Sequence, residues 1–324
     1  MRLIIDTDTA GDDCFSILLA LGHPGAVLEA VTICHGNIAF DQQVENALTT
    51  IDVAGFGGRV PVYPGVRRPL LRSPVDAAYV FGEDGMGDAG FPRTAQRPED
   101  RHAVDAIIDL VMANPGEIDI VAQAPLTNLA LAVAREPRIA QALRHLWIMG
   151  GTDNGMGNVT PAAEFNFYAD PEAARMVLAA GLRITLFTWT RTLADTQIEP
   201  DELARIAASP APLARFFTQV NKAAAEFSQD RYGHAATVHP DTATCACALD
   251  PSLMLGTREA FVDVETQPGL ARGYCSVPST RLPAQDIADP LLGPDAPPNV
   301  RIVEAFDGLR FRAMLRRTLG VDGG

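Results

Sequence analysis

The sequence has 324 residues, of which 47% are hydrophobic and 20% charged, and its formal net charge at pH 7 is -14. No apolar run reaches the roughly 20 residues of a membrane-spanning helix, and a chain this acidic lacks the clustered Lys and Arg that bind a phosphate backbone. We therefore expect a soluble protein that binds neither membranes nor nucleic acid.

The predicted elements alternate between strands and helices over the first 188 residues. Apolar runs and their stop signals predict, in chain order, a strand at 2–6, a helix at 14–21, a strand at 27–34, helices near 42–55 and 102–112, a strand at 118–122, a helix at 126–134, a strand at 146–149, a helix at 171–180 and a strand at 183–188. This order is typical of a mostly parallel central sheet with helices on both faces, which binds ligands at the C-terminal ends of its strands.

The rest of the chain has a more helical pattern. Two helices are expected between 200 and 249, then a strand-like segment at 260–265 and a final helix at 306–319. The Pro- and Gly-rich stretches at 60–74 and 282–298 predict loops rather than linkers, because the composition does not shift across them. We therefore expect residues 1–324 to form one large α/β domain.

A glycine-rich segment at 81–90 is either a plain surface loop or a flexible cover over a pocket.

The cysteines and the N-terminus bear on the compartment. The five cysteines are an odd number without a repeated Cys-x-x-Cys pair, which favours reduced, buried thiols. Met1 leads directly into an apolar strand pattern rather than into the apolar region of a signal peptide. The cytoplasm is the expected location.

Four carboxylates fall within eight residues where the first strand ends and the first helix begins. They are Asp6, Asp8, Asp12 and Asp13. Grouping this much negative charge is unfavourable without a cation or shifted protonation, although one Asp could simply cap the helix. Hard oxygen ligands without nearby His or Cys favour calcium or magnesium over zinc. The cluster thus predicts metal-assisted hydrolysis, in which a carboxylate deprotonates a metal-bound water.

This acidic motif, DTDTAGDD at 6–13, resembles the N-terminal signature of the inosine-uridine nucleoside hydrolase family. The likeness continues in the family's order at TICHGN (32–37), APLTNLA (124–130), MGG (149–151), GNVTPAAEFN (157–166) and DPEAA (170–174). The resemblance implies the Rossmann-like nucleoside hydrolase fold and the family's reaction, hydrolysis of the N-glycosidic bond of a ribonucleoside to ribose and free nucleobase. It also implies nucleoside salvage, and the homodimers or homotetramers that the family commonly forms.

The resemblance further implies roles for individual residues. A Ca²⁺ ion would be held by Asp8, Asp13, the backbone carbonyl of Thr127, and Asp241, and Asp8 would also be the base that activates the attacking water. The ribose and its 5′-hydroxyl would be held by Asp12, Asn37, Met149, Asn158, Glu164 and Asn166. Carboxylates around the sugar would stabilise an oxocarbenium-like transition state.

Two positions depart from the family pattern. The best-known members have a His-Asp-Pro triplet, whereas this chain has His239-Pro240-Asp241. His239 would be the acid that protonates the leaving base, or a loop histidine turned away from it. Phe81 stands where some members have a histidine and could instead stack on the base.

Two other functions compete with this interpretation. A strand ending in Asp6-Thr7-Asp8-Thr9 also resembles the nucleophile motif of haloacid dehalogenase-type phosphohydrolases, which normally need a lysine against the phosphate. The sole lysine, Lys222, lies in an Ala-rich stretch without a matching signature. The same carboxylates could also serve a non-catalytic, calcium-dependent binder of nucleosides or sugars. The sequence leaves open whether a purine or a pyrimidine is preferred.

Overall fold

The central sheet is built around the strand that precedes the acidic motif. In the computed structural model, which describes residues 1–277 and 297–321, the main sheet has eight strands in the order β3-β2-β1-β4-β5-β6-β12-β9 within those ranges. Neighbouring strands are parallel except β12 and β9, which are antiparallel. The strands are β1 (Arg2–Thr7), β2 (Val27–Ile33), β3 (Val62–Pro64), β4 (Ile118–Ala122), β5 (His145–Met149), β6 (Ile184–Phe187), β9 (Met254–Ala260) and β12 (Val300–Phe306).

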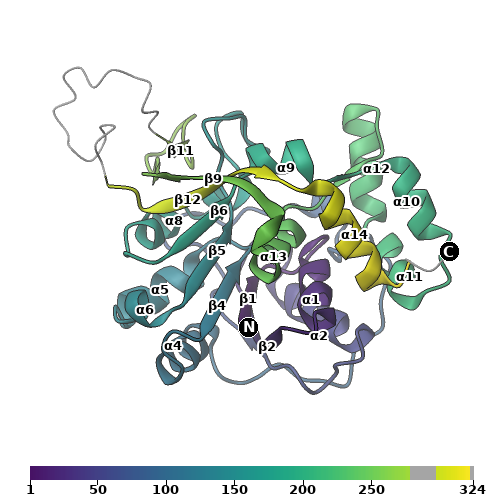
Figure 1. Ribbon diagram of the computed structural model, residues 1–324, viewed down its shortest axis with the longest axis horizontal. Coiled ribbons are helices and arrows are strands. Elements are labelled where there is room, and N and C mark those ends of the chain that lie inside the picture. Colours follow the sequence, from purple (N-terminus) through teal and green to yellow (C-terminus); the bar gives the residue numbers. More distant parts are fainter. Residues whose placement is uncertain (278–296, 322–324) are drawn as a thin grey trace.

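Helices cover both faces of this sheet (Figure 1). Side chains alternate along β1, so Leu3 and Ile5 pack on one face while Ile4 packs on the other. The Leu3 face is covered by α1 (Asp13–Gly22), α2 (Phe40–Val53) and α13 (Pro240–Leu249). The Ile4 face is covered by α4 (Ala103–Ala113), α5 (Thr127–Arg135), α6 (Ile139–Ala142) and α8 (Pro171–Leu178). The predicted single α/β domain with a mostly parallel sheet is confirmed.

A third apolar cluster joins α1 to helices at one side of the molecule, on the right in Figure 1. Phe15 of α1 packs there with Phe217, their ring centroids 4.4 Å apart. The helices on this side are α10 (Pro200–Ala207), α11 (Pro212–Val220), α12 (Lys222–Tyr232) and α14 (Gly308–Leu319). The remaining elements are α3 (Ala78–Phe81), α7 (Phe165–Ala169), α9 (Trp189–Asp195), η1 (Pro251–Leu253), β7 (Gln197–Ile198), β8 (Thr237–Val238), β10 (Asp263–Val264) and β11 (Cys275–Ser276).

The chain reverses its direction across the sheet at β1. Strands β2 and β3 follow on one side of β1, and β4 lies on its other side. Loops that leave the C-terminal ends of β1 and β4 therefore diverge, and such a switch point is where open α/β sheets bind their ligands. The acidic motif follows β1 and the Thr127 segment follows β4, so the fold brings both to this edge.

The predictions for the C-terminal part were less accurate. The segment 200–249 contains four helices, α10 to α13, rather than two, and also strand β8, which pairs with β7 just before the segment. The strand predicted at 260–265 is wrong, because β9 ends at Ala260 and β10 covers only Asp263–Val264. Strand β9 is an edge strand with alternate residues exposed, which weakens its apolar pattern. Strand β12 was missed, and most of the loop predicted at 282–298 lies outside the described residues.

The cysteines agree with the predicted reduced state. All five are buried and unpaired, and burial raises the pKa of each thiol. Across the described part of the chain, no helix combines the length and apolar character needed to cross a bilayer.

Candidate active site

The acidic motif folds into a buried loop between β1 and α1. Asp8 and Asp13 are fully buried, and Asp12 is 5% exposed. Gly11 makes the turn possible with a φ of +50°, a left-handed conformation that favours glycine. A side chain at Gly11 would also collide with Phe81, since a Cβ there would lie 2.4 Å from Cε1 of that ring. Phe81 therefore lies directly over the acidic loop.

The glycine-rich loop after α3 is tied to the acidic loop. The backbone N–H of Gly11 donates to the carbonyl of Gly85 at 2.8 Å. The buried side-chain amide of Asn46 donates to two carbonyls, those of Thr9 at 3.0 Å and Asp84 at 2.8 Å. Asn46 lies outside the sequence motifs that predict the site. Its amide joins the two loops and holds the backbone of the acidic motif in place.

Asp13 is the most firmly held of the carboxylates. One oxygen accepts hydrogen bonds from the Thr7 hydroxyl at 2.6 Å and the Gln123 amide at 2.9 Å. The other accepts from the Asn37 amide and the Ala10 N–H, both at 3.2 Å. Burial nevertheless raises the pKa of Asp13 to about 6. Loops after β1, β2 and β4 thus converge on this one side chain.

Asp8 has one bonded and one unpartnered oxygen. Its Oδ2 accepts the N–H of Asn37 at 2.9 Å, whereas Oδ1 is buried without a hydrogen-bond partner among the described residues. Gly36 permits this approach, because a Cβ at that position would lie 1.8 Å from Asp8 Oδ2. Burial, together with the charge of Asp13, raises the pKa of Asp8 well above its usual range. The free oxygen is available to a cation or a water molecule.

Asp12 and Asp241 are adjacent although they are far apart in the sequence. Asp12 Oδ2 accepts the N–H groups of Asp241 at 2.9 Å and Thr242 at 3.2 Å, at the start of α13. The Thr242 hydroxyl also donates to the Asp12 carbonyl at 3.0 Å. Burial raises the pKa of Asp12 to about 7. Burial and the charge of Asp12 raise the pKa of Asp241 well above its usual range. Like Asp8, Asp241 has a buried Oδ1 without a partner among the described residues.

This donor set suits a hard cation. Asp8 and Asp241 each have an oxygen without a hydrogen-bond partner within the described ranges. Burial and repulsion between the carboxylates disfavour the charged form of both side chains. A bound cation would stabilise that charged form. Oxygen ligands of this kind bind calcium or magnesium better than zinc. Within the ranges that the structure describes, no three His, Cys, Asp or Glu side chains form a preassembled metal cluster. Backbone and water oxygens would have to complete the coordination.

Thr127 and Asn128 begin α5 at the end of β4, and both are buried. The Asn128 amide donates to Asp6 Oδ1 at 2.8 Å and to the Ile33 carbonyl at 3.1 Å. Asp6 therefore holds the ends of neighbouring strands together. Burial raises its pKa to about 6.

Two of the predicted ribose residues, Asn166 and Met149, connect to the carboxylates, whereas Asn158 is exposed. The Asn166 amide donates to the carbonyls of Met149 at 3.2 Å and Gln123 at 3.3 Å. Gln123 also donates to Asp13, so it joins the two parts of the site, although sequence analysis missed it. The sequence signal that points to Gln123 as a site residue is its position directly after the buried strand β4. The charge of Glu164 contributes to the raised pKa of Asp8, which places those two carboxylates near each other.

Glu164 and Asn158 shape the loop after β5. Glu164 accepts three backbone N–H groups, from Gly151 and Asn166 at 2.8 Å and from Phe167 at 3.2 Å, and so caps α7. Burial raises its pKa to about 7. Asn158 Oδ1 accepts the N–H of Phe165 at 2.9 Å. Both side chains thus have structural bonds in addition to any bond with a ligand.

His239 lies within the core. It is fully buried, and its ring stacks on Phe217 with centroids 5.5 Å apart and lies 5.7 Å from Phe15. Its Nε2 bonds to the Thr237 hydroxyl at 2.8 Å. Burial lowers the pKa of His239 to about 3, so the ring is neutral at pH 7. This environment counts against the predicted role as acid, which stays a prediction.

Replacing His239 by Gln tests that role. We expect a lower Tm and a kcat for inosine that changes far less than the roughly 10²–10⁴-fold that a general acid contributes, because the ring packs in the core. Thr237→Val, which removes the hydrogen bond to His239, is the matched control and should also lower the Tm with little change in kcat. A kcat loss of that size for His239→Gln alone would restore the acid role.

A groove of about 470 Å³ lies between the α3 segment and α12. Tyr79 and Phe227 line it, with ring centroids 5.7 Å apart, together with Glu226 and Asp230. Gly82, next to Phe81, also lines the groove. Because Phe81 lies over Gly11, the groove adjoins the acidic loop across that ring.

Comparison with known proteins shows similarity along nearly the whole chain. The family model described as inosine-uridine preferring nucleoside hydrolase matches residues 3–313. The pyrimidine-specific ribonucleoside hydrolase RihB of Escherichia coli is 34% identical over 84% of this chain and 85% of its own length. Among solved structures, the plant nucleoside hydrolase PpNRh1 has a TM-score of 0.90 at 31% identity, covering 98% of both chains. A purine-preferring ribonucleoside hydrolase from Gardnerella vaginalis has a TM-score of 0.88 at 27% identity, covering 99% of both.

Proposed function

Because this chain belongs to the inosine-uridine preferring nucleoside hydrolase family, we propose that it cleaves the N-glycosidic bond of ribonucleosides with a Ca²⁺-bound water that Asp8 activates. The observation that carries this proposal is the buried Oδ1 of Asp8, which has no hydrogen-bond partner within the described ranges, at the switch point of the sheet. The other oxygen, Oδ2, accepts the backbone N–H of Asn37. Gly36 leaves room for this oxygen because it has no side chain. Asp8 thus has one oxygen free for the chemistry.

The metal would be held by Asp8, Asp13, Asp241 and the Thr127 carbonyl. When bound, Ca²⁺ lowers the pKa of a coordinated water. Asp8 would accept a proton from the attacking water, in the role of general base. Asp13 keeps its orientation through four hydrogen bonds from side chains and backbone. The matching unpartnered oxygen of Asp241 supports its place in the same set.

The sugar would be held by the polar residues around the carboxylates. Asp12, Asn37 and Asn166 would bind the 2′- and 3′-hydroxyls, and Met149, Asn158 and Glu164 would surround the 5′-hydroxyl. The link from Asn166 to Asp13 through Gln123 supports this arrangement. The carboxylates would stabilise the positive charge of an oxocarbenium-like transition state. Attack of water from the carboxylate side would invert the anomeric centre.

The nucleobase would lie toward Phe81. This partly exposed ring covers Gly11 and adjoins the groove lined by Tyr79 and Phe227. An aromatic face would stack on a purine or a pyrimidine. RihB is named pyrimidine-specific and the Gardnerella enzyme purine-preferring, so the relatives differ in base preference.

We also propose a cellular setting and an assembly for the enzyme. Buried, unpaired cysteines suit the reducing cytoplasm. A role in nucleoside salvage, a homodimeric or homotetrameric assembly and a single hydrolase domain over residues 1–324 rest on the family resemblance. The phosphohydrolase alternative has no support, because the family match extends over residues 3–313.

Ribose release tests the proposal directly. The protein is incubated with inosine, uridine, adenosine and cytidine, with calcium and after chelation, and free ribose is measured. We expect calcium-dependent release, ranked by base. Release that chelation does not affect would contradict the role of the metal. Binding of nucleosides without release would favour the non-catalytic binder.

A further inference from the structure

The hydroxyl of Thr127 is held between two buried side chains that have no assigned role. His35 Nε2 lies 2.9 Å from Thr127 Oγ1, and Asp170 Oδ2 lies 2.7 Å from the same atom. Thr127 and Asp170 are fully buried, and His35 is 3% exposed. His35 lies in the loop after β2, Thr127 begins α5 and Asp170 precedes the first residue of α8. The hydroxyl therefore joins three parts of the fold.

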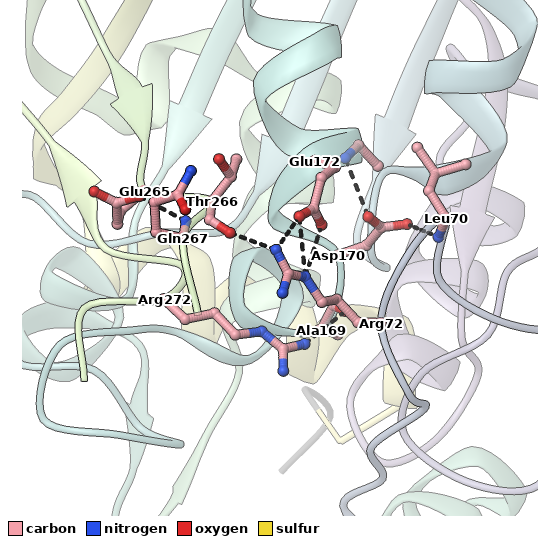
Figure 2. Close-up of polar contacts among 10 residues, drawn as sticks. Leu70, Arg72, Ala169, Asp170, Glu172, Glu265, Thr266, Gln267 and Arg272 are labelled. Carbon is pink, nitrogen blue, oxygen red and sulfur yellow. Dashed lines mark hydrogen bonds and ion pairs between the residues drawn. The ribbon is translucent and has the colours of Figure 1, made fainter. Parts of the chain in front are cut away.

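The direction of each hydrogen bond follows from the partners. Asp170 accepts the N–H groups of Leu70 at 2.9 Å and Ala173 at 3.1 Å, so both of its oxygens act as acceptors (Figure 2). The single proton of the Thr127 hydroxyl is then donated to Asp170. His35 must donate its Nε2–H to the remaining lone pair of the hydroxyl. Its other nitrogen, Nδ1, is buried without a partner among the described residues.

Further hydrogen bonds hold the loop at 66–72, which contacts both His35 and Asp170. The backbone N–H of His35 donates to the Val66 carbonyl at 2.9 Å. Two residues after Leu70, Arg72 donates through Nε to Glu172 of α8 at 3.0 Å and also donates to the carbonyl of Thr266 (Figure 2). The loop that supplies Val66 and Leu70 is thereby attached to α8. Asp170 and His35 consequently cannot shift independently of each other.

We propose that His35 and Asp170 are positioning residues, which hold Thr127 by its hydroxyl so that its carbonyl is oriented toward the cation. This inference rests on the calcium site proposed above. A neutral carbonyl attracts a cation less strongly than a carboxylate does, so its binding depends more on orientation. Hydrogen bonds from two sides restrict the side chain of Thr127 to one rotamer, and the turn from Pro125 to Thr127, closed by a 2.8 Å bond, restricts its backbone.

Thr127→Val tests the inference, because it removes the hydroxyl but keeps the shape and the backbone carbonyl. Calcium affinity is measured by isothermal titration calorimetry, without substrate. We expect binding about 10- to 100-fold weaker, the usual cost of losing a group that orients a metal ligand. Thr127→Ser, which keeps the hydroxyl, should bind calcium nearly as wild type does.

The chain offers a control for the loss of a Thr–His hydrogen bond, in a pair that is partly buried. The Thr185 hydroxyl bonds to His145 Nε2 at 2.8 Å, and Thr185 is 2% exposed. This pair lies in the N-terminal halves of β5 and β6, away from the candidate site. Thr185→Val should lower the Tm and leave the calcium Kd unchanged. If Thr127→Val also lowers only the Tm, Thr127 has a structural role alone and the inference is overturned.

A second pair of variants keeps the test independent of Thr127. His35→Gln can retain a donor near the position of Nε2, whereas His35→Leu cannot. We expect weaker calcium binding for His35→Leu and recovery with His35→Gln. Equal affinity of wild type and His35→Leu would overturn the inference while leaving the proposed reaction in place. Failure of wild type to bind calcium would instead overturn the calcium site itself, and the inference with it.

Discussion

Asp8→Asn is expected to lower kcat for ribonucleoside hydrolysis by about 10²–10⁴-fold, the usual contribution of a general base. Asparagine has nearly the same shape but cannot accept the proton of the attacking water. Its carbonyl oxygen can still accept the N–H of Asn37, as Asp8 Oδ2 does at 2.9 Å. The substitution also removes a buried charge next to Asp13, so the folded state should not lose stability.

The measurement is kcat with the preferred nucleoside, together with the Tm of each variant. Asp119→Asn is the control, because Asp119 is another buried aspartate, 2% exposed, and pairs with Arg144 at 2.6 Å. It lies near the start of β4, whereas the candidate site follows the end of that strand. This control should lower the Tm and preserve kcat. Normal turnover by a folded Asp8→Asn variant would refute the assignment of Asp8 as the base.

Calcium is expected to raise the Tm by several degrees, and by more at pH 8 than at pH 5. Burial raises the pKa of Asp12 to about 7 and that of Asp13 to about 6, from an ordinary value of 3.8. Between about pH 4 and pH 7, the calcium-free folded state therefore retains protons that the unfolded chain has released. Its stability falls as the pH rises through this window. A cation that binds only the folded state offsets this loss.

Asp241→Asn should remove most of the calcium-dependent rise in Tm and lower hydrolytic activity with it. The reason is that Asp241 Oδ1 is buried and unpartnered among the described residues, beside Asp12. Asp250→Asn is the matched control at the opposite end of α13, where Asp250 pairs with Arg310 at 2.8 Å near the surface. That variant should keep the full calcium response. A full response in Asp241→Asn as well would exclude Asp241 from the metal site.

Much of the fold was predictable from local sequence. Strand β4 has the predicted bounds, and the helices α1, α5 and α8 agree with prediction to within two residues at each end. Apolar periodicity and stop signals determine such elements because a buried strand or an amphipathic helix shows its period within its own residues. The predictions failed at β9 and β12, which pair with each other at the sheet edge. The stability of that pair comes from a partner that neither segment's own pattern reveals.

The sequence by itself also determined the family and the acidic cluster, since consecutive residues carry both. Only the tertiary structure showed that Asp241 lies beside Asp12 and that Gln123 joins Asp13 to Asn166. It also placed His239 in the core between aromatic rings, although a histidine near Asp241 suggested an acid. The physical reason is the same in each case. Burial and hydrogen-bond partners depend on contacts between distant segments, and those contacts determine which polar side chains remain free to react.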